Sequence, residues 1–336
     1  MGDSEKLPVI NKRQNIRSIL YKLPMPLRTI SFSRAKFSHT SSLNPNHEVS
    51  FKSASTNSSE NITKLQSKTE SVSAKAWAIA DAKTGSVVKG NNETKVKEVA
   101  SLTKIMTCLL SIKLCEQYEI SLQEVITVSK SASQINGTSA RLRENEQLSI
   151  WDLLHGLMLP SGNDAAVCLA EYFGKLIAGE EKAVKNAVRY FVREMNKTAK
   201  QLQLEKTNFV NPHGMSAPKH RSSAADICKL ASEALKNKLF AEICSTKSHT
   251  CHMLRPKEFT YRILTWQNTN KLLSMGFNGV KTGVTPSAGP CLCGSLKSGK
   301  KHLVLVILAS RSMEKRWEDI SSLANWALKE FPEAFT

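Results

Sequence analysis

The chain has 336 residues, of which 41% are hydrophobic, and its 47 Lys and Arg against 29 Asp and Glu give a formal net charge of +18. This length and composition are typical of a globular protein with one large domain or two smaller ones. The sequence contains no run of about 18 apolar residues, and no nucleic-acid motif or aromatic-interleaved basic stripe accompanies the charge. We therefore predict no transmembrane segment and no nucleic-acid partner.

Residues 1–72 differ in composition from the rest of the chain. They are rich in Ser, Asn and Lys, and between Asn11 and Asn46 they contain several Arg and Lys but no acidic residue. This composition is similar to that of an organelle transit peptide, although the acidic start of the chain fits such a peptide poorly. The alternative is a disordered basic tail. No secretion signal or membrane anchor is recognised. We expect one folded domain over residues 73–336.

The remaining chain alternates between two kinds of pattern. We expect a strand pair over about 76–90, a helix beginning near Ser101, and mainly helical segments to about 245. Two strand-like runs follow at Cys291–Leu296 and His302–Ala309. A last amphipathic helix runs from Trp317 to Leu328. Strands at both ends with helices between them predict one sheet built from both ends of the domain and a helical insertion, an α+β fold.

A tight link between two helices is predicted in the middle of this region. The apolar, periodic segment Ile150–Leu159 ends before Pro160. The next helix is expected over Asp164–Phe173, with Asp164 as a possible cap and Gly174 just past its end. Ser161-Gly-Asn163 forms the link between them.

The eight cysteines all follow residue 107. They include no C-x-x-C pair, and no metal-ligand spacing occurs among the His and Cys residues. We therefore expect reduced, mostly buried thiols and no bound metal.

Ser101 and Lys104 have the spacing of a nucleophile and its base. A serine hydroxyl is a poor nucleophile until a base removes its proton, and residues three apart on a helix share one face. A position near the helix N-terminus would favour negative charge developing at Ser101. Lys104 must be neutral to act as a base, and burial together with a second cation, for which Lys281 is the candidate, would lower its pKa.

Two more motifs follow in the order expected of such an enzyme. Ser161-Gly-Asn163 supplies a polar pair for proton transfer, and Lys281-Thr-Gly283 supplies a cationic strand edge. The ordered set predicts serine acyl-transfer chemistry with a lysine base. Ser298-Gly-Lys-Lys301 and Lys83-Thr-Gly85 repeat two of the patterns, but each lies in a predicted turn between strands and is interpreted as structural.

From about Ala74 to Phe331 the sequence resembles the catalytic domain of the D-alanyl-D-alanine carboxypeptidases, the low-molecular-mass penicillin-binding proteins. The segments that carry the resemblance are Ala100–Thr107, Leu153–Ala165, Asn208–Gly214, Asn268–Leu273, Gly279–Thr285 and Ala288-Gly289. The resemblance implies a β-lactamase/DD-peptidase-like fold, with an antiparallel sheet, flanking helices and an inserted helical subdomain.

The resemblance also implies a role for each motif. Ser101 would be acylated by a D-Ala-D-Ala-terminated peptide, and Lys104 would take its proton. Ser161 would pass a proton to the leaving D-alanine, and Asn163 would hold a peptide carbonyl of the substrate. Water would then hydrolyse the acyl-enzyme, and β-lactams would acylate the same serine. No cofactor is implied.

Substrate-binding roles are implied in the same way. The backbone N–H groups of Ser101 and Val284 would form an oxyanion hole. Lys281 and Thr282, with Gly283 beside them, would contact the terminal carboxylate. Arg316 aligns with an arginine that family members use for that carboxylate, since a guanidinium suits bidentate carboxylate binding.

Three points remain open at this stage. A histidine near the site in the family corresponds to His213, which is either catalytic or structural. A class A β-lactamase would need a deacylating Glu on an Ω-loop, and none is identified. A binding protein that retains the site without turnover is the non-enzyme alternative. The sequence also departs from the family pattern at Asn278-Gly279, where an Asp is usual, and at Ala225, where an Arg is usual.

Overall fold

The computed structural model describes residues 72–179 and 186–335. The predicted basic segment 1–72 lies outside the described residues except for Val72. The strands are β1 (Ala76–Asp81), β2 (Val87–Asn91), β3 (Val125–Thr127), β4 (Gln147–Ser149), β5 (Ser248–Arg255), β6 (Thr260–Gln267), β7 (Val280–Thr285), β8 (Gly289–Ser298) and β9 (Lys301–Leu308). The helices are α3 (Lys104–Gln117), α4 (Lys130–Ser133), α5 (Ile150–Met158), α6 (Asn163–Ala178), α8 (Ala187–Gln201), α9 (Ala224–Leu235), α10 (Lys238–Ser245) and α11 (Lys315–Glu330). Short 3-10 turns are η1 (Ala100–Thr103), η2 (Lys271–Ser274) and η3 (Pro332–Ala334).

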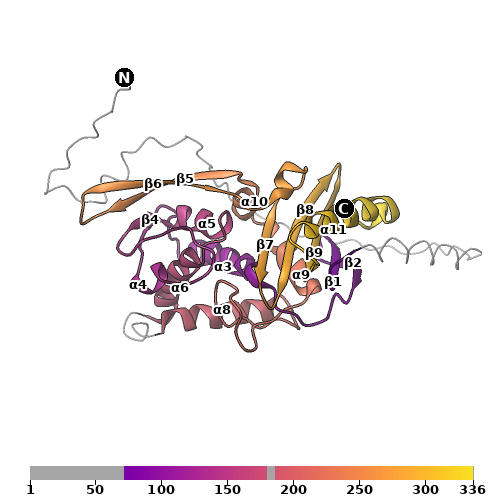
Figure 1. Cartoon of the computed structure of the whole chain (residues 1–336). Coiled ribbons are helices and arrows are strands. Elements are labelled where there is room, and N and C mark those ends of the chain that lie inside the picture. Colours follow the sequence, from indigo (N-terminus) through magenta and orange to yellow (C-terminus); the bar gives the residue numbers. More distant parts are fainter. Residues whose placement is uncertain (1–71, 180–185, 336) are drawn as a thin grey trace, which may run out of the picture. The chain divides into compact units, whose positions relative to one another are not determined.

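The main sheet is antiparallel and has the strand order β2-β1-β9-β8-β7. Its first two strands come from the start of the described chain and its last three from the end. Figure 1 shows the helices of the middle of the chain beside the β7 edge of this sheet. The prediction of one sheet built from both ends with a helical insertion is therefore confirmed.

Both faces of this sheet are covered by helices. On β1, Trp77 and Ile79 belong to the apolar cluster that includes Ile320, Leu323 and other residues of α11. The alternate residues Ala76, Ala78 and Ala80 belong to the second cluster, with residues of α9 and α3. Because successive side chains of a strand point to opposite faces, β1 is buried along its whole length. Small side chains on one face and large ones on the other set how closely each helix approaches.

The central helix α3 is buried on almost every side. Of its 14 residues 11 are buried, and these include Lys104 as well as the apolar residues. A helix surrounded in this way needs apolar residues all round rather than along one stripe. Its first residue is therefore held far from water, which matters for the chemistry of Lys104.

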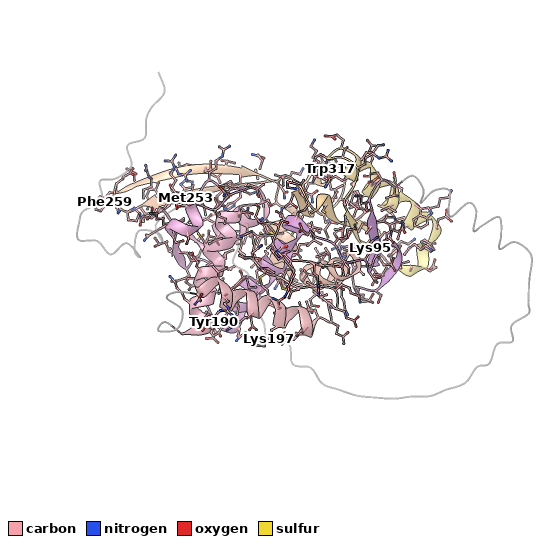
Figure 2. The ribbon with its side chains drawn as sticks, turned by 60° about the horizontal axis from the view of Figure 1, so that its bottom comes forward. Lys95, Tyr190, Lys197, Met253, Phe259 and Trp317 are labelled. Carbon is pink, nitrogen blue, oxygen red and sulfur yellow. The ribbon has the colours of Figure 1, made fainter. Side chains whose placement is uncertain are left out.

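A second sheet with the order β3-β4-β5-β6 was not predicted from the sequence. Its long β5–β6 hairpin extends over β4 and α5 in Figure 1, and Phe259 and Met253 mark it in Figure 2. Met253 is buried and faces Arg262 across the hairpin, whereas Phe259 at the turn is 54% exposed. A polar residue such as Arg262 on the inner face weakens the alternation that would reveal a strand.

The helix after Ser161-Gly-Asn163 differs from its prediction at both ends. It begins at Asn163 with Gly162 as its N-cap and continues through Gly174 to Ala178. The carboxylate of Asp164 does not cap it in the expected way. It accepts hydrogen bonds from the N–H groups of Ala140 at 2.8 Å and Leu142 at 3.1 Å, and so fixes the preceding loop. Gly174 lies inside the helix because α8 crosses there: a Cβ on it would meet the carbonyl oxygen of Ala187 at 1.9 Å.

All eight cysteines are free and buried, as predicted. The second copies of the Lys-Thr-Gly and Ser-x-x-Lys patterns lie where turns were expected. Lys83-Thr-Gly85 lies between β1 and β2, and Ser298 lies at the end of β8. Within residues 72–179 and 186–335, no helix combines the length and apolar character needed to cross a bilayer.

Gly174→Ala is expected to destabilise the fold, although alanine is the better helix former. The added methyl would lie within 2 Å of a backbone oxygen that cannot rotate away, and overpacking of this kind costs about 1–3 kcal/mol. Chemical denaturation of the variant and of Lys175→Ala, an exposed neighbour in the same helix, measures the difference. A Gly174→Ala protein as stable as the wild type would contradict the close α6–α8 approach.

Candidate active site

Ser101 lies in a 3-10 turn rather than in the α-helix that the sequence predicted. The turn η1 covers Ala100–Thr103, and α3 begins at Lys104. Such turns are common at the start of α-helices. The turn still brings the two side chains together, since Lys104 Nζ donates to Ser101 Oγ at 3.0 Å. The predicted pairing of Ser101 with Lys104 is therefore present in the structure.

The amine of Lys104 is enclosed by acceptors from three segments. Besides Ser101, it donates to Asn163 Oδ1 at 2.7 Å and to the carbonyl oxygen of His213 at 2.8 Å. Burial lowers its pKa well below the ordinary value, and the nearby amine of Lys281 lowers it further, against an opposing effect of Asp164. Lys104 is thus held beside the Ser101 hydroxyl, where burial and Lys281 favour its neutral form.

Asn163 contacts Lys104 from the start of α6, and Ser161 lies two residues before it in the link between α5 and α6. Ser161 has a φ of 66° and a buried Oγ without a hydrogen-bond partner in the described part of the chain. The Nδ2 of Asn163 donates to the carbonyl oxygen of Asn136 at 2.7 Å, which fixes which end of the amide faces Lys104. A Cβ at Gly137 would lie 2.6 Å from that Nδ2, so the loop approaches Asn163 closely at this glycine. A buried hydroxyl without a partner is available to a ligand.

The strand β7 forms the opposite side of the site. Lys281 is buried there, and its Nζ donates to the carbonyl oxygen of Thr282 at 3.1 Å. Burial lowers its pKa to about 7; Cys244 opposes this effect and Arg316 adds to it. Gly283 packs against η1, where an added Cβ would lie 3.1 Å from the backbone nitrogen of Ser101. Val284 is 47% exposed, and β7 is an edge strand of the main sheet.

Arg316 reaches β7 from the first turn of α11. Its Nη1 donates to the carbonyl oxygen of Gly283 at 3.5 Å, and its guanidinium carbon lies 4.5 Å from the centre of the Trp317 ring, which Figure 2 labels. Its Nε is buried without a partner among the described residues. Burial lowers the pKa of Arg316. The structure therefore places a guanidinium at the same strand as Lys281 and Thr282.

His213 contributes its main chain to the site. Its carbonyl oxygen accepts from Lys104, while its ring Nδ1 lies 3.2 Å from the backbone nitrogen of Met215, which donates to it. Burial, then the charges of Lys104 and His220, lower the pKa of its ring to about 3. The ring is neutral at neutral pH, and the contact made with Lys104 requires only the backbone.

A carboxylate beyond the end of β7 was missed by the sequence analysis. Glu98 accepts from Ser216 Oγ at 2.7 Å and also from the hydroxyl of Ser287. Glu98 precedes the turn η1, Ser216 follows the segment of His213, and Ser287 follows β7. No short motif contains these three residues. A groove lined by residues 96–98 and 216–221 opens beside this cluster.

Residues 72–179 and 186–335 contain no group of three or more His, Cys, Asp or Glu side chains placed to hold a metal ion. The chemistry that the site can perform with its own groups is the attack of an activated serine on a carbonyl, with an amine as base.

Known proteins with similar sequences are DD-peptidases. A family model described as D-alanyl-D-alanine carboxypeptidase matches residues 62–312. The D-alanyl-D-alanine carboxypeptidase DacF of Bacillus subtilis (strain 168) is 31% identical over 261 residues, which cover 77% of this chain and 63% of the relative. The D-alanyl-D-alanine carboxypeptidase DacD of Salmonella typhimurium is 33% identical over 269 residues, which cover 77% of this chain and 64% of the relative.

Solved structures give the same result for the fold. The Streptomyces K15 DD-transpeptidase superimposes with a TM-score of 0.71 at 32% identity, covering 77% of this chain and 98% of the other. Penicillin binding protein 6B from Escherichia coli gives a TM-score of 0.65 at 30% identity, covering 77% and 78%.

The arrangement of sheet and helices is that of the penicillin-binding DD-peptidases, whose fold is β-lactamase-like. The chain belongs to the D-alanyl-D-alanine carboxypeptidase family. It spans 63% and 64% of the length of the two curated relatives described above. The predicted fold class and family are confirmed.

Lys281→Met is expected to change how stability depends on pH. The pKa of Lys281 is about 7 in the folded chain against an ordinary 10.5, so between these values the unfolded chain binds one more proton. Stability contributed by Lys281 therefore rises with pH in that window and is constant below it. The unfolding free energy of the wild type minus that of Lys281→Met should rise above about pH 7, by at most about 1.4 kcal/mol per pH unit. Urea unfolding at several pH values tests this, and a difference independent of pH would contradict it.

Proposed function

We propose that this chain is a serine-type D-Ala-D-Ala carboxypeptidase that acts through an acyl-enzyme on Ser101. The observation that carries the proposal is the buried amine of Lys104, which lies 3.0 Å from Ser101 Oγ and whose pKa is lowered by burial and by the amine of Lys281. A neutral amine at this distance accepts the hydroxyl proton as the oxygen attacks. The family membership of the chain supports the same reaction.

In the first step Ser101 Oγ bonds to the carbonyl carbon of the penultimate D-alanine, and its proton passes to Lys104. The negative charge that forms on the carbonyl oxygen is stabilised by the backbone N–H groups of Ser101 and Val284. The close packing of Gly283 against the Ser101 nitrogen supports a hole made by these two segments.

In the second step the bond to the terminal D-alanine breaks, and its nitrogen takes a proton. Ser161 has a buried hydroxyl without a partner among the described residues, which supports its role in carrying this proton from Lys104. Asn163, held by Lys104 and Asn136, keeps an amide N–H for a carbonyl of the substrate. Water then attacks the carbonyl carbon of the ester and gives a proton to Lys104. The bond to Ser101 Oγ breaks, Lys104 returns a proton to this oxygen, and the shortened peptide leaves as a carboxylate.

The terminal carboxylate of the substrate would lie near Lys281, Thr282 and Gly283, with Arg316 beside them. Two features of Arg316 support this assignment: its Nε has no partner among the described residues, and its Nη1 lies 3.5 Å from the carbonyl oxygen of Gly283. A guanidinium and a hydroxyl bind a carboxylate through charge-assisted hydrogen bonds. β-Lactams, which present a carboxylate and a reactive carbonyl, would acylate the same Ser101.

No observation favours the alternatives. The relatives reported above are named as carboxypeptidases and a transpeptidase, not as β-lactamases. The name of the K15 structure supports one related possibility, the transfer of the acyl group to an amine instead of water.

The test combines a fluorescent penicillin with a D-Ala-D-Ala-terminated peptide. We expect the full chain to become covalently labelled and to release D-alanine, and Ser101→Ala to do neither, since no oxygen remains to form the ester. Ser298→Ala is the matched control, because Ser298 belongs to the second Ser-x-x-Lys pattern and should label like the wild type. A labelled Ser101→Ala protein would show that another residue is acylated.

We further propose that residues 73–336 form the catalytic domain. Ser73 supports this boundary, because its N–H and hydroxyl donate to Asp319 at 3.0 and 2.6 Å and join the start of the domain to α11. A chain beginning at Val72 should therefore fold and release D-alanine at the rate of the full chain. Comparison of kcat/KM for the two chains tests this. A folded but inactive short chain would assign a catalytic role to the basic segment.

A further inference from the structure

Thr103, the last residue of the turn η1 that contains Ser101, forms a buried hydrogen-bonded pair with His220. The mechanism proposed above does not use this pair. Thr103 and His220 are 0% and 3% exposed, and Thr103 Oγ1 lies 2.9 Å from His220 Nε2. The pair joins the last residue of η1 to a segment 117 residues further along the chain. Neither side chain contacts Lys104 or Ser101 in the hydrogen bonds of the site.

The direction of these hydrogen bonds follows from a backbone donor. The N–H of Val210 donates to His220 Nδ1 at 3.1 Å, so that nitrogen carries no proton in the neutral ring. The proton is therefore on Nε2, which donates to Thr103 Oγ1. The threonine hydroxyl in turn donates to the carbonyl oxygen of Ala100 at 2.8 Å. Burial lowers the pKa of His220 to about 4, which keeps the ring neutral.

This series of hydrogen bonds ends at the carbonyl of Ala100, a residue with a strained backbone conformation. Ala100 has a φ of 47°, in the left-handed region that a residue with a Cβ rarely adopts. It directly precedes Ser101, so its peptide plane sets the direction of the Ser101 N–H. Strained residues persist only where their surroundings hold them. Gly214 packs against the same carbonyl, because a Cβ there would lie 1.9 Å from Ala100 O.

We propose that His220 and Thr103 are positioning residues for the reaction: they hold the Ala100 carbonyl, and so orient the hydroxyl and the backbone N–H of Ser101 for acylation. The inference rests on the proposed function of Ser101. The segment from His213 to His220 would then serve the site twice: the carbonyl of His213 accepts from Lys104, and His220 holds Thr103. A displacement of the reacting groups by about 1 Å can lower a rate about 100-fold, so a small shift of this turn is sufficient.

The experiment compares two substitutions of one residue. Thr103→Val keeps the shape of the side chain but removes the hydroxyl, whereas Thr103→Ser keeps the hydroxyl. We expect Thr103→Val to lower the second-order rate constant of acylation by fluorescent penicillin about 10- to 100-fold, and Thr103→Ser to retain most of it. His220→Gln, which keeps a donor at the place of Nε2, should retain more of the rate than His220→Leu.

Ser149→Ala is the control for a general loss of stability. Ser149 is a buried residue whose hydroxyl also makes two hydrogen bonds, to the carboxylate and the backbone N–H of Asp152. It lies at the far end of the nine-residue helix α5, about 13 Å along its axis from the Ser161 link. The variant should lower the melting temperature and leave acylation unchanged. If Thr103→Val acylates at the wild-type rate, or if Ser149→Ala slows acylation equally, the inference is wrong.

A crystal structure of Thr103→Val decides the matter without turnover. The Ala100 carbonyl, and with it the Ser101 N–H, should point in a different direction in the variant than in the wild type; an unchanged Ala100–Ser101 peptide plane would overturn the inference. This readout also separates the two proposals. A wild-type chain that is not labelled would refute the proposed function, and the direction of the Ala100 carbonyl in Thr103→Val would still support or refute the role of His220 and Thr103.

Discussion

The burial of one amine, that of Lys104, is the constraint on which the rest of the site depends. Taking an ammonium ion out of water costs several kcal/mol, and this burial, together with the nearby amine of Lys281, lowers the pKa of Lys104 and favours its neutral form. The three acceptors of Lys104 come from the nucleophile turn, the α5–α6 link and the segment at His213. Each of these segments must be brought to the first residue of a helix that is buried on almost every side. The large core around α3 is thus a requirement of the chemistry as well as of stability.

The segments meet closely because the backbone makes room at particular residues. Ala100 and Ser161 adopt positive φ values, and Gly214 has a φ of 90° with its α-carbon against the Ala100 carbonyl. A side chain at Gly214 would push the segment that carries His213 away from Lys104. Left-handed conformations at residues with a Cβ cost about 1–3 kcal/mol each. Two of the residues with a Cβ and a positive φ, Ala100 and Ser161, lie in the segments of the proposed site, where the surrounding packing must hold them.

The sequence predicted the pairing of Ser101 with Lys104 better than the local structure that brings them together. The spacing of Ser101 and Lys104 brings the pair together in a 3-10 turn as well as in an α-helix, so the wrong local structure did not affect that prediction. The β5–β6 hairpin was not predicted, because its inner face includes polar residues such as His249, whose partner Asp152 lies 97 residues away. The same limit applies to His220. Its function depends on Thr103, and no local pattern reveals a hydrogen bond between residues 117 apart.

The edge position of β7 determines how a peptide would lie in the proposed active site. An edge strand has backbone N–H and C=O groups without a strand partner, and an extended peptide can add to it as a further strand. The proposed carboxylate site at Lys281 and Thr282 is at the start of β7, and the proposed oxyanion donor Val284 follows it. A peptide whose C-terminus lies at Thr282 must therefore run antiparallel to β7, with its preceding residues directed past Thr285 toward Ser287. There Glu98 joins Ser287 to Ser216, so the part of the substrate that differs between peptides would meet this cluster rather than the catalytic groups. The proposed binding of the terminal carboxylate and the proposed contacts with the variable part of the peptide would in this way lie at opposite ends of one strand.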